Sequence, residues 1–305
     1  MTTAGADHVR LVSDPSSEVF TGLRPLLFSI AYRMVGSAMD AEDLVQDAYL
    51  RWHGAPDVDV RSPKAYLATI VTRLAINHLH SARVQRESYV GPWLPEPLMT
   101  EHVPDASGHV ELSESLSMAF LVLLERLSPV ERAVFLLSEV FDFEYAEIAR
   151  IVDKTEANCR QLLARAKKRL RPGPRPRFPV TSAHAERMLE RFSRAATMGD
   201  MDGLLALLAE DITVWSDGGG KVAAALQPIR GANRAARFML GALRKFVPVD
   251  HVVRPAEING QPGLISYLCG KPRTALAFDI VGDRIQTIYI IANPDKLRAL
   301  PETDP

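Results

Sequence analysis

The stretch FEYAEIARIVDKTEANCRQLLARAKKRL, residues 143–170, decides the fold of the middle of this chain. Ile148 and Val152 repeat at the spacing of one helix face, and Thr155 is a good N-cap for a second helix. Asp153 occupies the turn between them, where aspartate tolerates a left-handed backbone better than most residues other than glycine. Two helices joined by so short a turn predict a helix-turn-helix motif.

The second helix of this motif, expected over 155–171, carries six Lys or Arg against one acid. The DNA major groove admits an α-helix, and cations neutralise its phosphates, so this helix is predicted to bind DNA. A merely basic amphipathic helix is the alternative. Cys159 lies on the inward stripe, where we expect packing rather than reactivity. The outward residues expected to face DNA are Asn158, Arg160, Gln161, Arg165 and Lys168.

Composition bounds the class of protein. The 305 residues are 47% hydrophobic and 24% charged, which is typical of a globular protein of two or three domains. The net charge of −1 excludes a bulk polyanion binder, although charge can still be segregated locally. Two cysteines without a C-x-x-C pattern indicate neither a zinc site nor a disulfide framework. No apolar run is long enough for a membrane span, and MTTAGADHVR is no signal peptide, so we expect a cytoplasmic protein without a membrane partner.

An acidic helix is expected near the N-terminus, in DAEDLVQDAYLRWH at 40–53. Asp40 is the expected N-cap, and acids in a first turn stabilise the helix dipole. Four acids within eight residues exceed that need. They predict a negative face for a basic partner, made by Asp40, Glu42, Asp43, Gln46 and Asp47.

The next helix begins at Ser62 as N-cap with Pro63 at its first position. Between residues 62 and 86 it carries four Lys or Arg and no acid. Cations for phosphates and rings for stacking suit nucleic acid, whereas a solvated polar face is the alternative. The candidate DNA-facing residues are Lys64, Tyr66, Arg73, Asn77, His80 and Arg83.

Residues 88–115 have the composition of a linker, with five acids, several Pro and Gly, and no Lys or Arg. Trp93 and Leu94 are unusual in a linker because an exposed indole is costly, so we expect this segment to dock on another part of the protein. A chance exposed Trp is the alternative.

The C-terminal third has helices first and then a run of strands, which predicts an α+β layer fold. Within it, SDGGGKV at 216–222 suggests a phosphate-binding loop. Val222, however, stands where such a loop needs Ser or Thr. The local sequence instead predicts a tight glycine turn between two strands.

Three segments together resemble the extracytoplasmic-function sigma factors of bacterial RNA polymerase. DAEDLVQDAYLRW is similar to the region 2 segment that docks on the polymerase clamp, and SPKAYLATIVTRLAINHLHSAR to the helix that melts and reads the −10 element. LSPVERAVFLLSEVFDFEYAEIARIVDKTEANCRQLLARAKKRL is similar to region 4, which reads the −35 element. MGDMDGLLALLAEDITVWSDGG resembles SnoaL-like domains, whose cone-shaped α+β fold surrounds a pocket. The expected fold is therefore multidomain, with two all-α sigma domains, the second with a helix-turn-helix, followed by an α+β SnoaL-like cone.

The expected domains are region 2 at 1–87, an acidic Pro-rich linker at 88–115, region 4 at 116–171, a short linker at 172–181 and the SnoaL-like domain at 182–305. One subgroup of these sigma factors is similar in having this added domain together with the motifs WLPEP, DGGGK and NPDKL, which stand here at 93–97, 217–221 and 293–297. The resemblance implies interdomain regulatory contacts by Trp93, Leu94, Pro95, Glu96, Asp217, Gly218, Gly219, Gly220, Lys221, Asn293, Pro294, Asp295, Lys296 and Leu297.

The resulting hypothesis is a transcription initiation factor whose partners are core RNA polymerase and promoter DNA. It is expected to need no cofactor or metal, to perform no catalysis and to be a monomer when free. A small ligand in the C-terminal pocket stays open. The alternatives are a SnoaL-type isomerase or hydrolase with a DNA-targeting appendage, and a ligand-sensing DNA-binding regulator of the repressor type. Against an enzyme, the candidate acid–base residues Asp217, His251 and Asp279 form no recognisable dyad.

Overall fold

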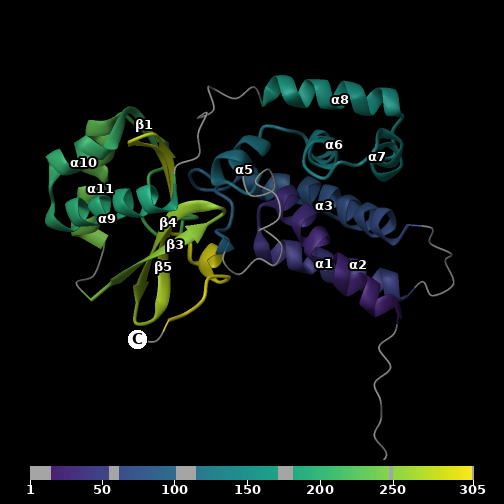
Figure 1. The fold of residues 1–305 in the computed structure, drawn as a ribbon, viewed down its shortest axis with the longest axis horizontal. Helices are drawn as coiled ribbons and strands as arrows, with labels where there is room; N and C mark the ends of the chain where they lie inside the picture. The colour runs from purple at the N-terminus through teal and green to yellow at the C-terminus, as the bar shows by residue number, and fades with distance from the viewer. Residues whose placement is uncertain (1–14, 55–61, 101–114, 171–180, 247–249, 304–305) are drawn as a thin grey trace, which may run out of the picture.

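The computed structural model describes residues 15–54, 62–100, 115–170, 181–246 and 250–303. Figure 1 shows two halves, with helices α1–α8 on one side and a curved sheet with helices α9–α11 on the other. The segment that follows α3 runs between the halves and contacts both. The predicted fold class, two helical parts followed by an α+β domain, is confirmed.

Three helices form the first part: α1 (Pro15–Val35), α2 (Ala38–His53) and α3 (Pro63–Glu87). The prediction that Asp40 caps α2 is wrong by one turn. Ser37 is the N-cap, and its hydroxyl accepts from the Asp40 backbone N–H at 3.1 Å. Helix α3 begins at Pro63 as predicted, with the Ser62 hydroxyl accepting from the Ala65 N–H at 3.3 Å.

The second helical part comprises α5 (Met118–Leu124), α6 (Pro129–Glu139), α7 (Tyr145–Val152) and α8 (Glu156–Arg169). Asp153 ends α7 in the left-handed region at φ 53°, and the Thr155 side chain caps α8, so the predicted helix-turn-helix is present. Helix α8 ends two residues before the predicted Arg171. The two helical parts share one apolar core, which runs from Phe20 in α1 to Leu170 after α8.

The C-terminal domain begins with α9 (Ser182–Met198) and α10 (Met201–Leu207), which precede β1 (Leu208–Asp217), β2 (Ile229–Arg230) and α11 (Ala232–Phe246). Then follow β3 (Val252–Ile258), β4 (Gln261–Leu268), β5 (Lys271–Val281), β6 (Arg284–Ile291) and a short 3₁₀ helix (Pro294–Leu297). The strand order is β2-β1-β6-β5-β4-β3, with β1 and β6 parallel and the other pairs antiparallel.

Two sequence-based expectations for this domain need correction. Strand β2 was not predicted, because two residues are too short for a periodic signal. The turn at Gly218–Lys221 does not join two hairpin strands, since the next strand begins only at Ile229. It opens a longer loop, closed at its start by the Lys221 N–H donating to the Gly218 carbonyl at 3.0 Å.

The two faces of the sheet have different partners. One face packs with α9–α11 into a core that includes Phe192, Phe278 and Ile288. The other face packs against the linker and α5, through Leu94 and Met118 among others. The linker is therefore sandwiched between the sheet and the helical half, and this position brings the three quoted motifs together.

Candidate functional sites

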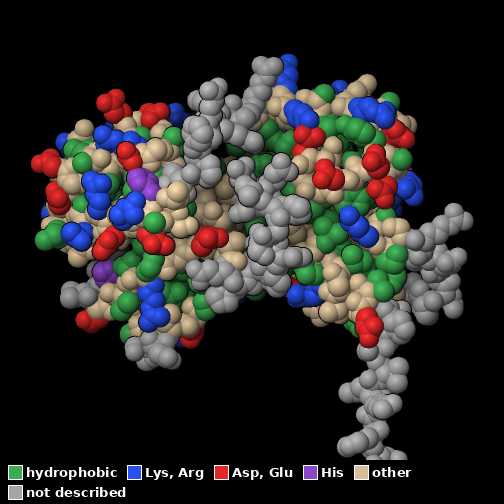
Figure 2. All heavy atoms as spheres, viewed as in Figure 1, with side chains coloured by type: hydrophobic (Ala, Val, Ile, Leu, Met, Phe, Trp, Pro, Cys, Tyr) green, Lys and Arg blue, Asp and Glu red, His purple; other side chains and the backbone are tan. Residues whose placement is uncertain are grey.

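The DNA-binding surface proposed on α8 lies on the outside of the molecule. Cys159, Leu163 and Ala166 point inward and are buried. Figure 2 shows Lys and Arg side chains along the region of α8. Arg160 pairs with Glu156 at 2.8 Å and lies over the Tyr145 ring at 4.7 Å. All five predicted residues are exposed: Asn158, Arg160, Gln161, Arg165 and Lys168.

The acidic face of α2 is also accessible. Glu42, Asp43, Gln46 and Asp47 are exposed, while Asp40 is half-buried beside the His78 ring nitrogen at 3.4 Å. Glu42 is paired with Arg24 of α1. Three of the five predicted residues, Asp43, Gln46 and Asp47, therefore present polar side chains to solvent and have no ion pair within the described part of the chain.

The candidate DNA face of α3 is divided by the structure. Asn77 and His80 are exposed, as the prediction requires. Tyr66 instead packs on Trp52 with ring centroids 5.8 Å apart, and the Lys64 ammonium lies 5.1 Å above the Phe143 ring. The side chain of Arg83 lies outside the described residues.

Arg73 departs furthest from the expected arrangement. Its Nε donates to the Ile151 carbonyl at 2.9 Å and its Nη2 to the Arg150 carbonyl at 2.8 Å. These carbonyls belong to the last turn of α7, where helix geometry leaves acceptors unpaired and the dipole favours a cation. In this arrangement the exposed Arg73 side chain therefore joins α3 to the helix-turn-helix.

Asp217 is the centre of an interdomain clamp. Its side chain has 0% exposure. Oδ1 accepts from the Tyr89 hydroxyl at 2.6 Å and from the Gly219 N–H at 3.0 Å. Oδ2 accepts from the Leu94 N–H at 2.9 Å and from Lys296 Nζ at 2.7 Å. A buried carboxylate needs several such donors, and here they come from all three quoted motifs and from Tyr89.

Lys296 holds the linker from the other side of this clamp. Its Nζ also donates to the Leu94 carbonyl, and it lies 4.1 Å from the centre of the Trp93 ring and 5.0 Å from that of Tyr89. Two aromatic faces and one carboxylate thus surround a buried ammonium. Trp93 is half-buried, and its ring lies against Lys296 and against Gly36 of the first helical part. We call Tyr89, Trp93, Leu94, Asp217, Asn293 and Lys296 the Asp217 clamp.

The glycines of DGGGK allow this approach. Gly219 has φ +59°, and a Cβ there would lie 2.3 Å from Asn293 Nδ2. Asn293 in turn donates to the Tyr89 hydroxyl at 2.9 Å and caps the 3₁₀ helix by accepting from the Asp295 N–H. Lys221 pairs with Asp295 inside the C-terminal domain, and this bond lowers the pKa of the Asp295 carboxyl. Lys221 therefore supports the loop, and Asp217 makes the contact with the linker.

Glu96 of WLPEP contacts the helical half. Its Oε2 accepts from the Ala38 N–H at 2.7 Å and the Met39 N–H at 3.3 Å, so the linker caps the N-terminus of α2. Burial raises the pKa of the Glu96 carboxyl, against the opposing effect of these hydrogen bonds. Tyr32 donates to the Glu96 carbonyl at 2.6 Å. Pro95 is buried beside it.

Sequence reasoning missed several residues of these contacts. Tyr89 precedes the quoted motif, and burial together with its hydrogen bond to Asp217 raises the pKa of its phenol. Tyr32 and Asn259 are buried polar residues that the helical and strand patterns treat as ordinary positions. Asn259 and Gly260 form an Asn-Gly pair between two strands, which predicts a turn but not the contacts of the Asn259 side chain with other segments.

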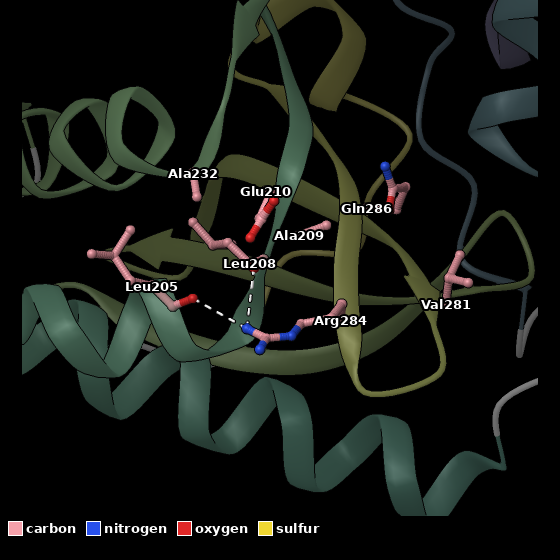
Figure 3. Close-up of a pocket in the computed structure, with 8 residues that line it drawn as sticks. All are labelled: Leu205, Leu208, Ala209, Glu210, Ala232, Val281, Arg284 and Gln286. Atoms are coloured by element: carbon pink, nitrogen blue, oxygen red, sulfur yellow. Dashed lines mark hydrogen bonds between the residues drawn. The ribbon is translucent and has the colours of Figure 1, made fainter.

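A depression of about 470 Å³ lies at the start of β1 and β6. Figure 3 shows Arg284 turned toward the backbone of Leu205 and Leu208, and its closest bond, 2.6 Å, is to the Ala206 carbonyl. The Arg284 guanidinium therefore caps the C-terminal end of α10. Among the other described residues that line the depression, Glu210 has the only ionisable side chain. The depression holds no pair of carboxylates and no His–Asp pair among the described lining residues.

The three acid–base candidates of the enzyme hypothesis lie apart. Asp217 on β1 pairs with Ile291 on β6, which pairs with Ala275 on β5. Asp279 lies four residues further along β5, about 13 Å from Ala275, and is therefore even further from Asp217. His251 precedes β3 at the far edge of the sheet.

The described residues contain no cluster of His, Cys, Asp and Glu that could hold a metal ion. None of the described helices is long and apolar enough to cross a membrane.

Comparison with known proteins assigns the two helical parts. Residues 19–84 match the family model Sigma-70 region 2, and residues 117–170 match Sigma-70, region 4. The ECF RNA polymerase sigma factor SigJ of Mycobacterium tuberculosis is 35% identical over 292 residues, which cover 92% of this chain and 93% of the relative. The chain belongs to the extracytoplasmic-function sigma factors of RNA polymerase.

Other relatives extend the likeness of this sigma factor over its whole length. The probable ECF RNA polymerase sigma factor SigI of M. tuberculosis is 30% identical, with 94% of this chain and 96% of the relative covered. The crystal structure of M. tuberculosis SigJ matches with a TM-score of 0.73 at 32% identity, covering 94% of this chain and 99% of that one. Since this coverage includes the C-terminal domain, the sigma factor and SigJ share their overall architecture.

Proposed function

We propose that this sigma factor directs core RNA polymerase to its promoters and that its C-terminal domain regulates it from within the same chain. The proposal assigns the acidic face of α2 to polymerase, α3 to the −10 element and α8 to the −35 element. The chain itself then performs no catalysis, and the C-terminal sheet provides a docking face for the linker. The separation of Asp217, His251 and Asp279 supports a non-enzymatic domain.

The observation that carries the proposal is the buried clamp of Asp217 and Lys296 on the linker. It holds the linker on the C-terminal domain, and Glu96 of the same linker is bonded to the start of α2, so the two halves are kept in one closed arrangement. Polar groups buried between domains stabilise a unique arrangement only while every partner is in place. Ligands and partners shift such an arrangement only by contacting its open and closed states differently.

The closed arrangement is incompatible with reading both promoter elements at once. Elements at −10 and −35 lie roughly 25 base pairs apart, or about 85 Å along B-form DNA at 3.4 Å per base pair. Arg73 of α3, however, is hydrogen-bonded directly to the last turn of α7, the helix that precedes α8. Promoter recognition therefore requires α3 and the helix-turn-helix to separate, and the contacts that join them set how readily this occurs.

Transcription from the full chain with core RNA polymerase tests the assignment. The holoenzyme should initiate at promoters that core polymerase alone does not use. Arg165→Ala and Arg160→Ala should each weaken promoter binding by ~1–3 kcal/mol if their side chains contact bases. Arg194→Ala, on the exposed face of α9, is the matched control and should bind as the wild type does. Absence of any polymerase-dependent initiation by the wild-type chain would refute the proposed function.

A further inference from the structure

The turn between β3 and β4 contains Asn259, whose side chain is not required to form the turn. Asn259 and Gly260 join the paired residues Ile258 and Gln261, with φ of 54° and 68°. Asn-Gly is the favoured pair for such a two-residue turn because both residues tolerate positive φ. That requirement concerns the backbone alone, and a turn side chain is normally solvated. The Asn259 side chain has 0% exposure.

Every polar atom of the Asn259 side chain bonds to another part of the molecule. Oδ1 accepts from the Leu98 N–H at 3.0 Å. Nδ2 donates to the Tyr32 hydroxyl at 2.7 Å and to the Leu116 carbonyl at 3.1 Å. These three partners belong to α1, to the linker and to the segment that leads into α5. The Asn259 backbone N–H adds a bond to the Leu98 carbonyl at 2.8 Å.

Neighbouring residues of the turn repeat this pattern. Gly260 N–H donates to the Thr100 hydroxyl at 2.7 Å, and Gln261 Oε1 accepts from the Met118 N–H at 2.8 Å. Met99 forms an antiparallel bridge with Ile258, so the linker adds one residue pair to the edge of the sheet. Gln261 and Thr100 are both buried.

We infer that Ile258–Gln261 is a second interdomain joint, the Asn259 clasp, which opens independently of the Asp217 clamp and directly holds both helical parts. The clamp bonds to the linker at Tyr89 and Leu94, whereas the clasp bonds to α1 and to the entry of α5. Because regions 2 and 4 must separate to reach both promoter elements, the clasp is one of the contacts that must be released, together with the Arg73 bonds between α3 and α7. Its regulatory role rests on the function proposed above, but its independence as a joint does not.

Asn259→Asp is the sharpest substitution for this joint. Aspartate tolerates positive φ and retains an acceptor for the Leu98 N–H. It removes the Nδ2 donor and directs a carboxylate oxygen at the Leu116 carbonyl, which loses its partner. Leaving a buried acceptor unsatisfied is expected to shift the closed-to-open equilibrium about tenfold or more. Asn233→Asp, the same change on the exposed first turn of α11, is the matched control.

Hydrogen exchange on the free full-length chain tests the independence of the joint. In Asn259→Asp the amides of Leu98 and Met118 should exchange about tenfold faster, while the Leu94 amide in the clamp should not change. Asp217→Asn should give the reverse pattern. Equal acceleration of all three amides, or no acceleration at all, would overturn the inference. If Asn259→Asp does not fold, Thr100→Val removes the acceptor of the Gly260 N–H and the long hydroxyl bond to the Glu257 carbonyl, and it should show a smaller acceleration at Leu98. Unchanged exchange at Leu98 in this variant also overturns the inference.

Binding to core polymerase separates this inference from the proposed function. If Asn259→Asp shows the expected exchange pattern and also binds core polymerase more tightly than the wild type, both the clasp and the proposed function are supported. The same exchange pattern with unchanged affinity leaves the clasp as a joint and refutes the regulatory role of the closed arrangement.

Discussion

Arg73 and Ile151 are joined by a hydrogen bond of 2.9 Å between the guanidinium Nε and the main-chain carbonyl. The bond crosses from α3 of region 2 to α7 of region 4, and Arg73 makes a second one to Arg150. A residue that the sequence assigns to promoter DNA is thus occupied by the protein in the closed arrangement. Under the proposed function, promoter phosphates and the carbonyls of this helix end would be alternative partners for the same cation.

Replacing Arg73 by alanine should therefore loosen the contact between the two regions. Each lost hydrogen bond is expected to lower the free energy of unfolding by about 0.5–1.5 kcal/mol. Urea unfolding measures this change. Arg73→Lys keeps the charge but not the two-bond geometry, so it should recover only part of the loss. Equal stability of Arg73→Ala and wild type would mean that water replaces the bonds without cost.

Asp217→Asn should destabilise the closed arrangement because it leaves the Lys296 ammonium buried without a counter-charge. Breaking one side of a buried ion pair typically costs about 3–5 kcal/mol. The double variant Asp217→Asn with Lys296→Met removes both charges and should recover much of this loss. Urea midpoints and small-angle scattering of the three proteins provide the measurement. A double variant no more stable than the single one would show that hydrogen bonds, rather than the ion pair, dominate the clamp.

Gly219→Val should disturb the loop that carries Asp217. Valine resists the positive φ of this position, and its Cβ would overlap Asn293, so a cost of about 1–3 kcal/mol is expected. Transcription and scattering should both change. Gly241→Ala in α11 is the control, since a Cβ there meets nothing within 4 Å and should be neutral or slightly stabilising. If Gly219→Val has the transcription activity and the overall dimensions of the wild type, the loop is only a turn and has no regulatory role.

Glu96 should contribute a pH dependence of known sign. Burial raises the pKa of its carboxyl in the folded protein above the ordinary value of 4.5, so the folded state binds the proton more readily than the unfolded chain. The contribution of Glu96 to the free energy of unfolding therefore falls as pH rises from 4.5 through the raised folded pKa. Glu96→Gln should remove this decline, because glutamine keeps an acceptor oxygen for the Ala38 and Met39 N–H groups but does not titrate.

Urea unfolding at a series of pH values from 4.5 upward tests this prediction. Glu186→Gln, on the exposed face of α9, is the control and should keep the wild-type slope. A slope unaltered by Glu96→Gln would assign the pH dependence to other groups.

The sequence by itself determined the local elements of this sigma factor. Helical periodicity, the Thr155 cap and Asp153 at the turn are short-range properties of the backbone, so the helix-turn-helix follows from them. The order of the C-terminal third, helices first and then a run of strands, was likewise predicted, and β3–β6 follow one another there. The three short motifs indicated that distant segments meet, through the family resemblance and not through any local rule.

Only the tertiary structure decided what those segments do to one another. Arg73, Tyr66 and Lys64 look like a nucleic-acid face on one helix, yet their neighbours come from other parts of the fold. The backbone of Asn259 forms a turn, and its side chain hydrogen-bonds to three other segments. The neighbouring sequence predicts the turn but not the side-chain bonds. The physical reason is that a buried polar atom takes its partner from whatever surrounds it, and those surroundings are set by long-range packing.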